Sequence, residues 1–383
     1  MHKTPSQPYF SSGPCRKYHS HDPSSYPDAL LHRSRQAQDC RDLIASTINQ
    51  TKEALKLPDG YQVIITQGSD TGAIEAAFWN LLTHNGTTIL SWSNFGNKWR
   101  SDLEDQLKLR NLTVHELDHQ TMTYSDLLEI NNKIPQDDDL VLIWNATTVG
   151  LCLPDLNWLS PNHQGLVMVD GTSIVFAQDL PWERLDVVSF SWQKVLGGEA
   201  GLGMLVLSPN AINRLKNYQP EWPIPVILNL RNQKGEFNHI LGKDNTTNTI
   251  SFLLVDDYLK ALKWWKGEYQ NSSHAHQKLK EKLQWIDQWL EKHHDLGLKY
   301  LIGNPSLRSP TAVTLKTSLS SEELKVLHTE FEKNLIALDI KSHPYAQEGI
   351  RIWIGPTIEF EDLKILFQHL ERYLSFLGKK IES

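Results

Sequence analysis

The stretch from Asp186 to Leu207 constrains the fold more than any other part of the sequence, because two apolar runs there enclose a single lysine. The first run, 187–190, is typical of a buried strand, and a polar turn with Lys194, a glycine-dense patch and a second apolar run follow it. A lysine at a strand end loses water when the chain packs around it, which lowers its pKa and favours the neutral amine. Such an amine can form a Schiff base, although a lysine in an exposed hairpin loop would have the same local sequence.

A second strand-like run, 164–170, lies upstream and ends in a carboxylate, Asp170. One crossover segment separates this strand end from Lys194. An aspartate and a lysine at nearby strand ends suit pyridoxal phosphate (PLP), because the carboxylate holds the proton of the ring nitrogen and the lysine carries the aldehyde carbon. PLP also needs a site for its phosphate.

The third feature is a candidate phosphate site. Residues 61–66 read as a strand, a glycine turn with Ser69 and Asp70 follows, and a helix-like run begins at Ala73. A strand, a turn with capping residues and a helix form an anion site at the helix N-terminus. Any capped strand-to-helix turn looks similar, so the assignment depends on the lysine and the aspartate beside it.

Strands and helices alternate over residues 61–207, which predicts an α/β fold with a mainly parallel sheet and ligands beyond the C-terminal ends of its strands. Residues 219–250 look irregular, and helix and strand patterns after Ser251 predict a smaller α+β domain. We therefore expect a disordered N-terminus (1–8), a large PLP-binding domain (9–250) and a small C-terminal domain (251–383).

Composition excludes several classes of protein. The net charge is −7 with no basic run, which argues against a nucleic-acid partner, and no stretch reaches membrane-spanning length. The N-terminus lacks the apolar core of a secretory signal, and only three cysteines occur, so we expect a cytoplasmic protein. Two His-x-His pairs lack a third ligand at suitable spacing, so no metal site is predicted.

Six motifs together resemble the phosphoserine aminotransferases, which are class V members of the fold-type-I PLP enzymes: SFSWQKVLGGEAG, WNATTVG, VDGTS, QGSDTGAIE, YFSSGPC and GIRIWIG. The resemblance runs from Tyr9 to about Leu377. It implies a sheet of the seven-stranded type, a homodimer with shared active sites, and small-molecule amino and keto acids as substrates. The implied reaction converts 3-phosphohydroxypyruvate and L-glutamate to O-phospho-L-serine and 2-oxoglutarate in serine biosynthesis.

The resemblance also implies roles for single residues at the cofactor. Phe95 stacks on the ring, with Trp92 and Trp99 as rivals, and Thr147 bonds the ring oxygen. The implied cofactor residues of this chain are Ser69, Asp70, Phe95, Thr147, Asp170, Gln193 and Lys194. Asn248 and Thr249 are similar to a pair that reaches the cofactor phosphate of the partner subunit, although Ile250 stands where the family usually has proline.

Substrate residues follow from the same resemblance. Arg351 is placed at the substrate α-carboxylate, and Arg33 with His32 at the distal acid group. Pro344 stands where relatives have an arginine that helps to bind the phosphate, and proline offers neither charge nor a backbone N–H. We expect the Arg33 cluster to hold phosphoserine, with His343 as the nearest substitute for the missing arginine.

Two alternatives stay open at this point. One is another class V activity, such as an alanine–glyoxylate or serine–glyoxylate aminotransferase. The other is a catalytically silent relative, against which the presence of Lys194, Asp170, Thr147 and Gln193 argues. A cysteine desulfurase is discounted, because no cysteine follows Cys152.

Overall fold

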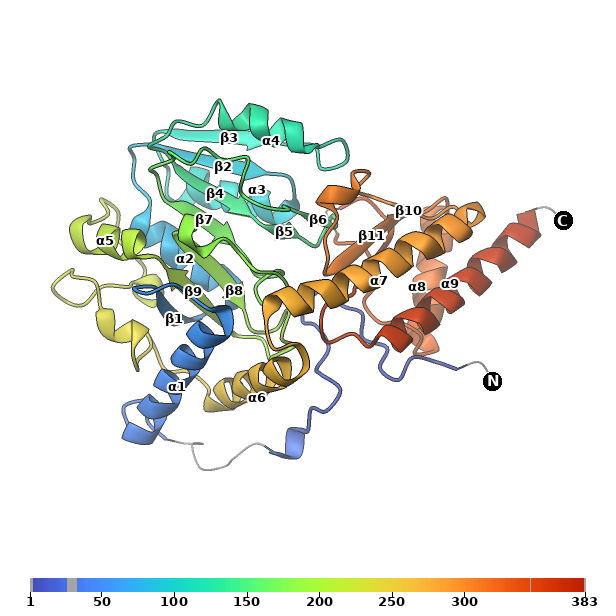
Figure 1. Cartoon of the computed structure of the whole chain (residues 1–383), viewed down its shortest axis with the longest axis horizontal. Helices are drawn as coiled ribbons and strands as arrows, with labels where there is room; N and C mark the ends of the chain where they lie inside the picture. The colour runs from blue at the N-terminus through green and yellow to red at the C-terminus, as the bar shows by residue number, and fades with distance from the viewer. Residues whose placement is uncertain (1–2, 26–32, 345, 382–383) are drawn as a thin grey trace.

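The computed structural model describes residues 3–25, 33–344 and 346–381. A seven-stranded sheet lies at one end of the molecule and a three-stranded sheet at the other, and the long helix α7 (Ser272–Lys292) runs from the middle of the molecule along the end with the three-stranded sheet (Figure 1). The mixed α/β architecture predicted from the alternation of strands and helices is confirmed.

The large sheet is parallel except at one strand. Its strands are, in spatial order, β1 (Gln62–Gln67), β9 (Leu202–Leu207), β8 (Val187–Ser191), β7 (Val167–Asp170), β4 (Asp139–Ile143), β2 (Thr87–Ser91) and β3 (Leu112–Glu116). Strand β9 pairs antiparallel with both of its neighbours, and every other pairing is parallel. The six strands other than β9 therefore end at one edge of the sheet, where ligands bind in this class of fold.

Helices cover the large sheet, and their spacing of apolar residues explains how. They are α1 (Gln38–Leu55), α2 (Ser69–Leu81), α3 (Asn94–Ser101), α4 (Tyr124–Asn131) and α5 (Pro209–Asn217). In α1 the buried residues Ile44, Ile48, Thr51 and Leu55 recur every three or four positions, which makes one apolar face. Helix α2 begins before the predicted Ala73, because Gly68 adopts φ 80° and turns the chain directly into the helix.

The small domain has an antiparallel sheet of β10 (Lys299–Tyr300), β11 (Ala312–Lys316) and β12 (Ile350–Trp353), with α8 (Ser321–Lys333) and α9 (Phe360–Ile381). The predicted capping box opens α8, since Ser320 and Glu323 each bond the other's backbone N–H. Helix α6 (Phe252–Tyr269) packs instead on the large domain: the Tyr258 hydroxyl lies 2.8 Å from that of Thr51 on α1. The boundary expected at residue 250 thus falls before a helix that contacts the larger unit.

The N-terminal segment lies along the small domain. The backbone N–H of Leu338 donates to Pro8 O at 2.7 Å, and that of Trp353 donates to Phe10 O at 3.0 Å. Residues 3–8 therefore differ from the disordered start expected for 1–8, because backbone pairing and hydrogen bonds from Ser6 to Asp362 hold them.

A buried ion pair anchors this segment to α9. Arg16 and Asp362 are 4% and 3% exposed, and Arg16 Nη1 lies 2.8 Å from Asp362 Oδ2. Burial alone would raise the pKa of Asp362, but hydrogen bonds from Arg16 and Ser6 hold it below its usual value. Breaking such a pair costs about 3–5 kcal/mol, because the remaining charge stays buried.

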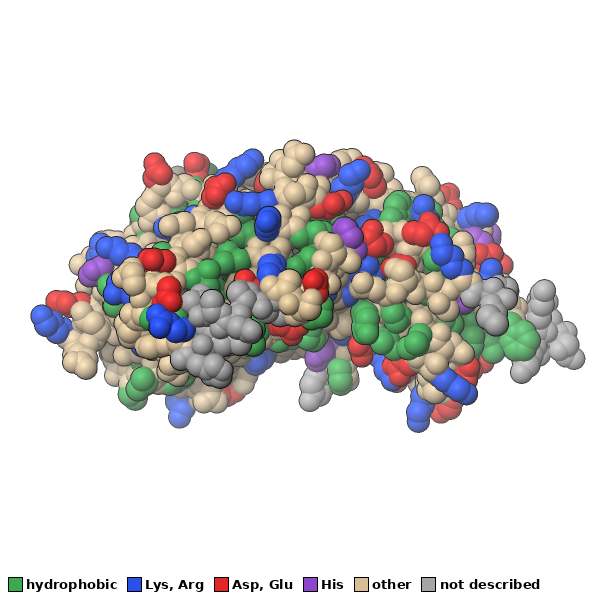
Figure 2. All heavy atoms as spheres, turned by 90° about the horizontal axis from the view of Figure 1, so that it is seen from below, with side chains coloured by type: hydrophobic (Ala, Val, Ile, Leu, Met, Phe, Trp, Pro, Cys, Tyr) green, Lys and Arg blue, Asp and Glu red, His purple; other side chains and the backbone are tan. Residues whose placement is uncertain are grey.

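The surface carries charged side chains of both signs. Acidic and basic side chains are interspersed on the face seen in Figure 2. Among the described residues no helix is long and apolar enough to cross a membrane, and no group of three potential metal ligands occurs. Residues 219–250 contain only short 3-10 turns, and Cys15, Cys40 and Cys152 are free and buried.

Candidate active site

A cavity of about 310 Å3 opens at the C-terminal edge of the large sheet. The residues that line it include Gly13, Pro14, Ser69, Asp70, Thr71, Phe95, Asn145, Thr147, Asp170, Thr172, Ser191, Gln193 and Lys194. They come from the segments at the ends of five strands (β1, β2, β4, β7 and β8) and from the N-terminal segment. Seven of the predicted cofactor residues therefore meet in one place, as the rule for ligands in such sheets requires.

Lys194 lies partly buried just after the end of β8. Its Nζ donates a hydrogen bond to the carbonyl oxygen of Ser12, and a Cβ added to Gly13 would lie 2.3 Å from Nζ. Burial, and to a lesser degree the charge of Arg351, lowers the pKa of Lys194. The amine is therefore shifted toward the neutral form that nucleophilic and base chemistry needs.

Asp170 ends β7 on the neighbouring strand. Its Oδ1 accepts a hydrogen bond from the Thr172 N–H at 3.0 Å, and its Oδ2 accepts one from Trp99 Nε1 at 3.2 Å. Burial raises the pKa of Asp170, and both donors oppose this shift because they stabilise the anion. A fixed, buried carboxylate of this kind can hold a proton on a heterocyclic nitrogen.

The predicted anion turn connects β1 to α2. Gly68 and Ser69 have φ angles of 80° and 60°, and the backbone N–H groups of both donate to Gly201 O. The next N–H groups, in the first turn of α2, have no acceptor within the helix and suit a phosphate. Gln193 Nε2 donates to Ser69 Oγ at 2.5 Å, and Gln193 Oε1 is buried without a hydrogen-bond partner among the described residues.

Phe95 lines the cavity on the side of the small domain, and His343 lies against the Phe95 ring. The centroids of the two rings are 6.0 Å apart. The His343 Nδ1 atom lies 3.2 Å from Asn94 Nδ2. Burial, with the charges of Arg351 and Lys194, lowers the pKa of His343, so its ring is neutral near pH 7.

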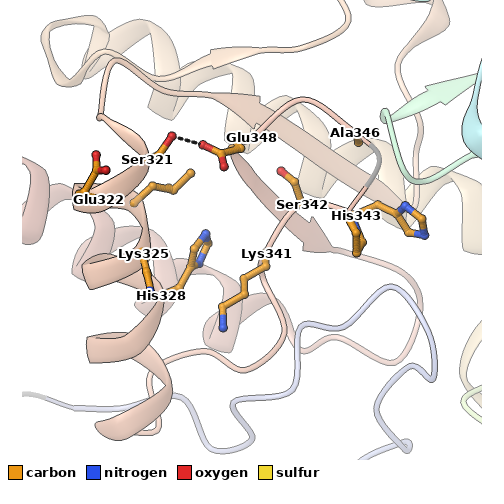
Figure 3. A pocket seen from close by; sticks show the side chains of 12 residues that line it. Ser321, Glu322, Lys325, His328, Lys341, Ser342, His343, Ala346 and Glu348 are labelled. Carbon is orange, nitrogen blue, oxygen red and sulfur yellow. Dashed lines mark hydrogen bonds between the residues drawn. The ribbon is translucent and has the colours of Figure 1, made fainter.

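A second cavity, of about 430 Å3, lies between α8 and the segments 341–344 and 346–349. Figure 3 shows the His343 ring directed away from the other side chains that line this cavity. His343 lines the second cavity, and its ring contacts Phe95, which lines the cavity of Lys194.

Arg351 lies in β12 and is mostly buried. Its Nε has no hydrogen-bond partner among the described residues, and burial lowers its pKa. Its charge acts on Lys194, His343 and Cys15, so the guanidinium lies near the amine, although Arg351 is not among the residues that line the cavity. The position suits recognition of a carboxylate, which an arginine binds through two parallel hydrogen bonds.

The remaining predicted residues lie outside the cavity of this single chain. Arg33 is paired with Asp39 at 3.0 Å, and both side chains are about half exposed. Asn248 and Thr249 are exposed, and the Asn248 carbonyl oxygen accepts a hydrogen bond from Gln67 Nε2 at 3.1 Å. His32 lies outside the described residues.

Sequence reasoning missed three features of the site. The Ser12 carbonyl and Gly13 contact Lys194, although YFSSGPC entered only as a motif of the family. Trp99, considered as a stacking ring, instead donates to Asp170. Asp70, predicted from the phosphate turn, also lies beside Asp170. No local pattern signals these contacts, because each joins segments far apart in the chain.

Known proteins with this geometry settle the family. No family model matches the chain. The phosphoserine aminotransferases of Methanosarcina barkeri and Methanosarcina mazei are each 38% identical to it, over 96% of this chain and 97% of theirs. The chain belongs to the phosphoserine aminotransferase family.

Solved structures agree on the fold. A phosphoserine aminotransferase from Cytophaga hutchinsonii is 19% identical, with a TM-score of 0.79 over 96% of this chain and 98% of that one. One from Bacillus circulans is 16% identical, with a TM-score of 0.78 over the same shares. The predicted fold type is therefore confirmed.

PLP is the cofactor of the family, and the residues of the cavity fit it. A relative from Trichomonas vaginalis, 13% identical with a TM-score of 0.77 over 94% of this chain and 99% of that one, was solved with PLP bound. In this chain Lys194 offers the amine, Asp170 the carboxylate for the ring nitrogen, and the start of α2 the phosphate site. The unpartnered Gln193 Oε1 offers a further polar contact.

We expect the substitution Gly13→Ala to displace Lys194 without unfolding the protein. The new Cβ would meet the flexible tip of the lysine, and this overpacking costs about 1–3 kcal/mol, in addition to the backbone strain of alanine at the Gly13 φ of 150°. PLP attachment, measured by borohydride reduction and peptide mapping, should weaken about five- to a hundredfold. Gly267→Ala is the matched control, because no atom lies within 4 Å of a Cβ there. Unchanged attachment in Gly13→Ala would show that the amine does not need this contact.

Proposed function

We propose that this chain is a PLP-dependent aminotransferase that converts 3-phosphohydroxypyruvate and L-glutamate to O-phospho-L-serine and 2-oxoglutarate in serine biosynthesis. The observation that carries the proposal is a partly buried lysine with a lowered pKa, near a buried carboxylate at the neighbouring strand end. The 38% identity to curated phosphoserine aminotransferases supports the choice of substrate. The three free cysteines support the cytoplasmic location predicted from the sequence.

The residues of the chain divide the chemistry between them. When bound, PLP supplies an electron sink for the charge that forms at the substrate Cα. Lys194 Nζ takes the proton from Cα, since its burial favours the neutral amine. Asp170 keeps a proton on the ring nitrogen, and Arg351 orients the substrate through its α-carboxylate.

The distal phosphate of the substrate needs other partners, because Pro344 replaces the arginine of relatives. His343 is the nearest candidate within the chain, and its neutral ring would act by donating a hydrogen bond. Arg33 supplies the positive charge. Because Arg33 does not line the cavity of its own chain, we infer that it acts at the active site of a partner subunit.

The surface that carries Arg33 supports a shared site. Arg35 donates to Thr246 O at 2.7 Å, and Arg41 pairs with Asp244 at 2.5 Å, so residues 33–41 are joined to the loop 244–249. If Asn248 and Thr249 reach the cofactor phosphate of a second subunit, Arg33 is carried to the same site. We therefore propose a symmetric homodimer in which each subunit completes the other's active site.

The second candidate function is another class V aminotransferase. A solved alanine–glyoxylate aminotransferase from Nostoc has a TM-score of 0.76 and 18% identity over 97% of this chain and 96% of that one. That likeness concerns the fold alone. Pro344 is the feature of this chain that favours the alternative, because it removes one phosphate contact.

Lys194→Ala tests the reaction. We expect loss of the visible absorbance band of the PLP-loaded protein and of nearly all transamination. Borohydride reduction of the wild type should place the pyridoxyl group on Lys194. Lys282 is the matched control for the labelling, because it is a second lysine with a pKa lowered by burial, to about 7. It should stay unlabelled, since its amine donates to three backbone carbonyls. A label on any lysine other than Lys194 would contradict the assignment.

Mixed dimers test the shared site. Subunits with Lys194→Ala and subunits with Thr249→Ala should form heterodimers with one intact and one doubly defective site. About half of the wild-type activity per dimer should return, since one of two sites is complete. Verified heterodimers that stay inactive would count against the contribution of Thr249 to the partner.

Substrate preference separates the two candidate functions. In the wild type, kcat/KM should be higher for phosphoserine than for alanine or unphosphorylated serine. His343→Ala and Arg33→Ala should each lower the phosphoserine value about ten- to a hundredfold, because a charge-assisted bond contributes about 1.5–3 kcal/mol. Arg110→Ala, at an exposed arginine paired with Glu221, is the control. A wild type that prefers alanine would establish the glyoxylate-type alternative.

A further inference from the structure

Two carboxyl groups face each other at the base of the cavity. Asp70 lies in the first turn of α2 and Asp170 at the end of β7; they are 7% and 8% exposed, and both line the cavity. The Asp70 carboxyl lies against the side chains of Asp170, Thr172 and Ser189. Its Oδ1 is buried and has no hydrogen-bond partner among the described residues.

The surroundings of the two groups are unequal. Both oxygens of Asp170 already accept hydrogen bonds, from Thr172 N–H and from Trp99 Nε1, and these favour its anion. Burial and the charge of Asp170 raise the pKa of Asp70 well above its usual value. The charged groups that face Asp70 are Asp170 and Lys194, and Lys194 donates to Ser12 O while burial lowers its own pKa. Two adjacent buried carboxylates repel each other unless a cation pairs with them, so one of the two carboxyl groups binds a proton.

We propose that Asp70 is a positioning residue that carries this proton and donates a hydrogen bond to Asp170, so that a single anion faces the ring nitrogen of PLP. The inference rests on the proposed function. The single negative charge of Asp170 then balances the single positive charge of the protonated ring nitrogen. A neutral Asp70 also avoids repulsion with the cofactor phosphate at the start of α2, where a carboxylate would be unfavourable.

The cofactor-free protein tests the proton directly. A raised folded pKa stabilises the fold at low pH, and this contribution is lost as the pH rises from the unfolded value near 4 through the folded value. Relative to Asp70→Asn, the wild type should therefore lose stability between pH 5 and 7, by up to about tenfold in the unfolding equilibrium constant per pH unit. Urea denaturation at each pH measures the difference.

Asp126→Asn is the matched control for the pH series. Asp126 is part of the capping box of α4, and hydrogen bonds from Thr123 lower its pKa, so its effect falls below pH 4. Its difference from the wild type should be constant between pH 5 and 7. A constant or reversed difference for Asp70→Asn would overturn the inference, because a constant difference means that folded and unfolded Asp70 bind the same number of protons in this range.

The PLP-loaded protein tests the hydrogen bond. Asp70→Ala removes the donor, and we expect a drop in kcat of about tenfold or more and a shift in the pH dependence of the PLP absorbance. Asp70→Asn should lose less on both measures, since its amide N–H still donates. Equal losses in the two variants would overturn the donor role.

The outcomes distinguish this inference from the proposed function. A wild type that binds no PLP would contradict the proposed function, while the proton on Asp70 stays measurable in the cofactor-free series. An active wild type without the pH-dependent difference would contradict the inference about Asp70 alone.

Discussion

The buried ion pair between Arg16 and Asp362 is the interaction on which the site depends. It fixes the N-terminal segment against α9, and backbone bonds from Leu338 and Trp353 continue the attachment toward Pro8 and Phe10. The segment then passes the end of β8, where Ser12 accepts the hydrogen bond of Lys194. The N-terminal segment, which α9 holds in place, therefore meets the end of β8 at the Lys194 amine. The position of this amine depends on contacts that lie far from it.

Exclusion of water gives this meeting point its chemistry. In a site of low polarity the charged form of each group is disfavoured unless a partner stabilises it. Lys194 is shifted toward the neutral amine, while Asp170 receives two donors that favour its anion. Within one cavity, the lysine is therefore shifted toward its neutral form and the aspartate is held toward its charged form. This difference lets Lys194 move protons while Asp170 stays charged.

The sequence predicts which residues at the strand ends form the site, but not the contacts that these residues make with distant segments of the chain. Lys194, Asp170 and Ser69 could be identified because each follows an apolar run, and parallel strands bring such ends to one edge. The contacts of Trp99, Ser12 and Asp70 could not, because they form between segments that no local periodicity relates. Arg33 and the loop 244–249 stay predictions, since their roles require a second subunit.

The ion pair also sets the order in which the molecule is completed during synthesis. Its partners are 346 positions apart, so the first residues made wait for nearly the last ones. Contacts of such separation form late in folding, and a chain on the ribosome can build the large sheet before α9 has emerged. Until then the segment that contacts Lys194 has no anchor on α9. The cofactor pocket therefore gains its N-terminal wall only after α9 has joined the fold.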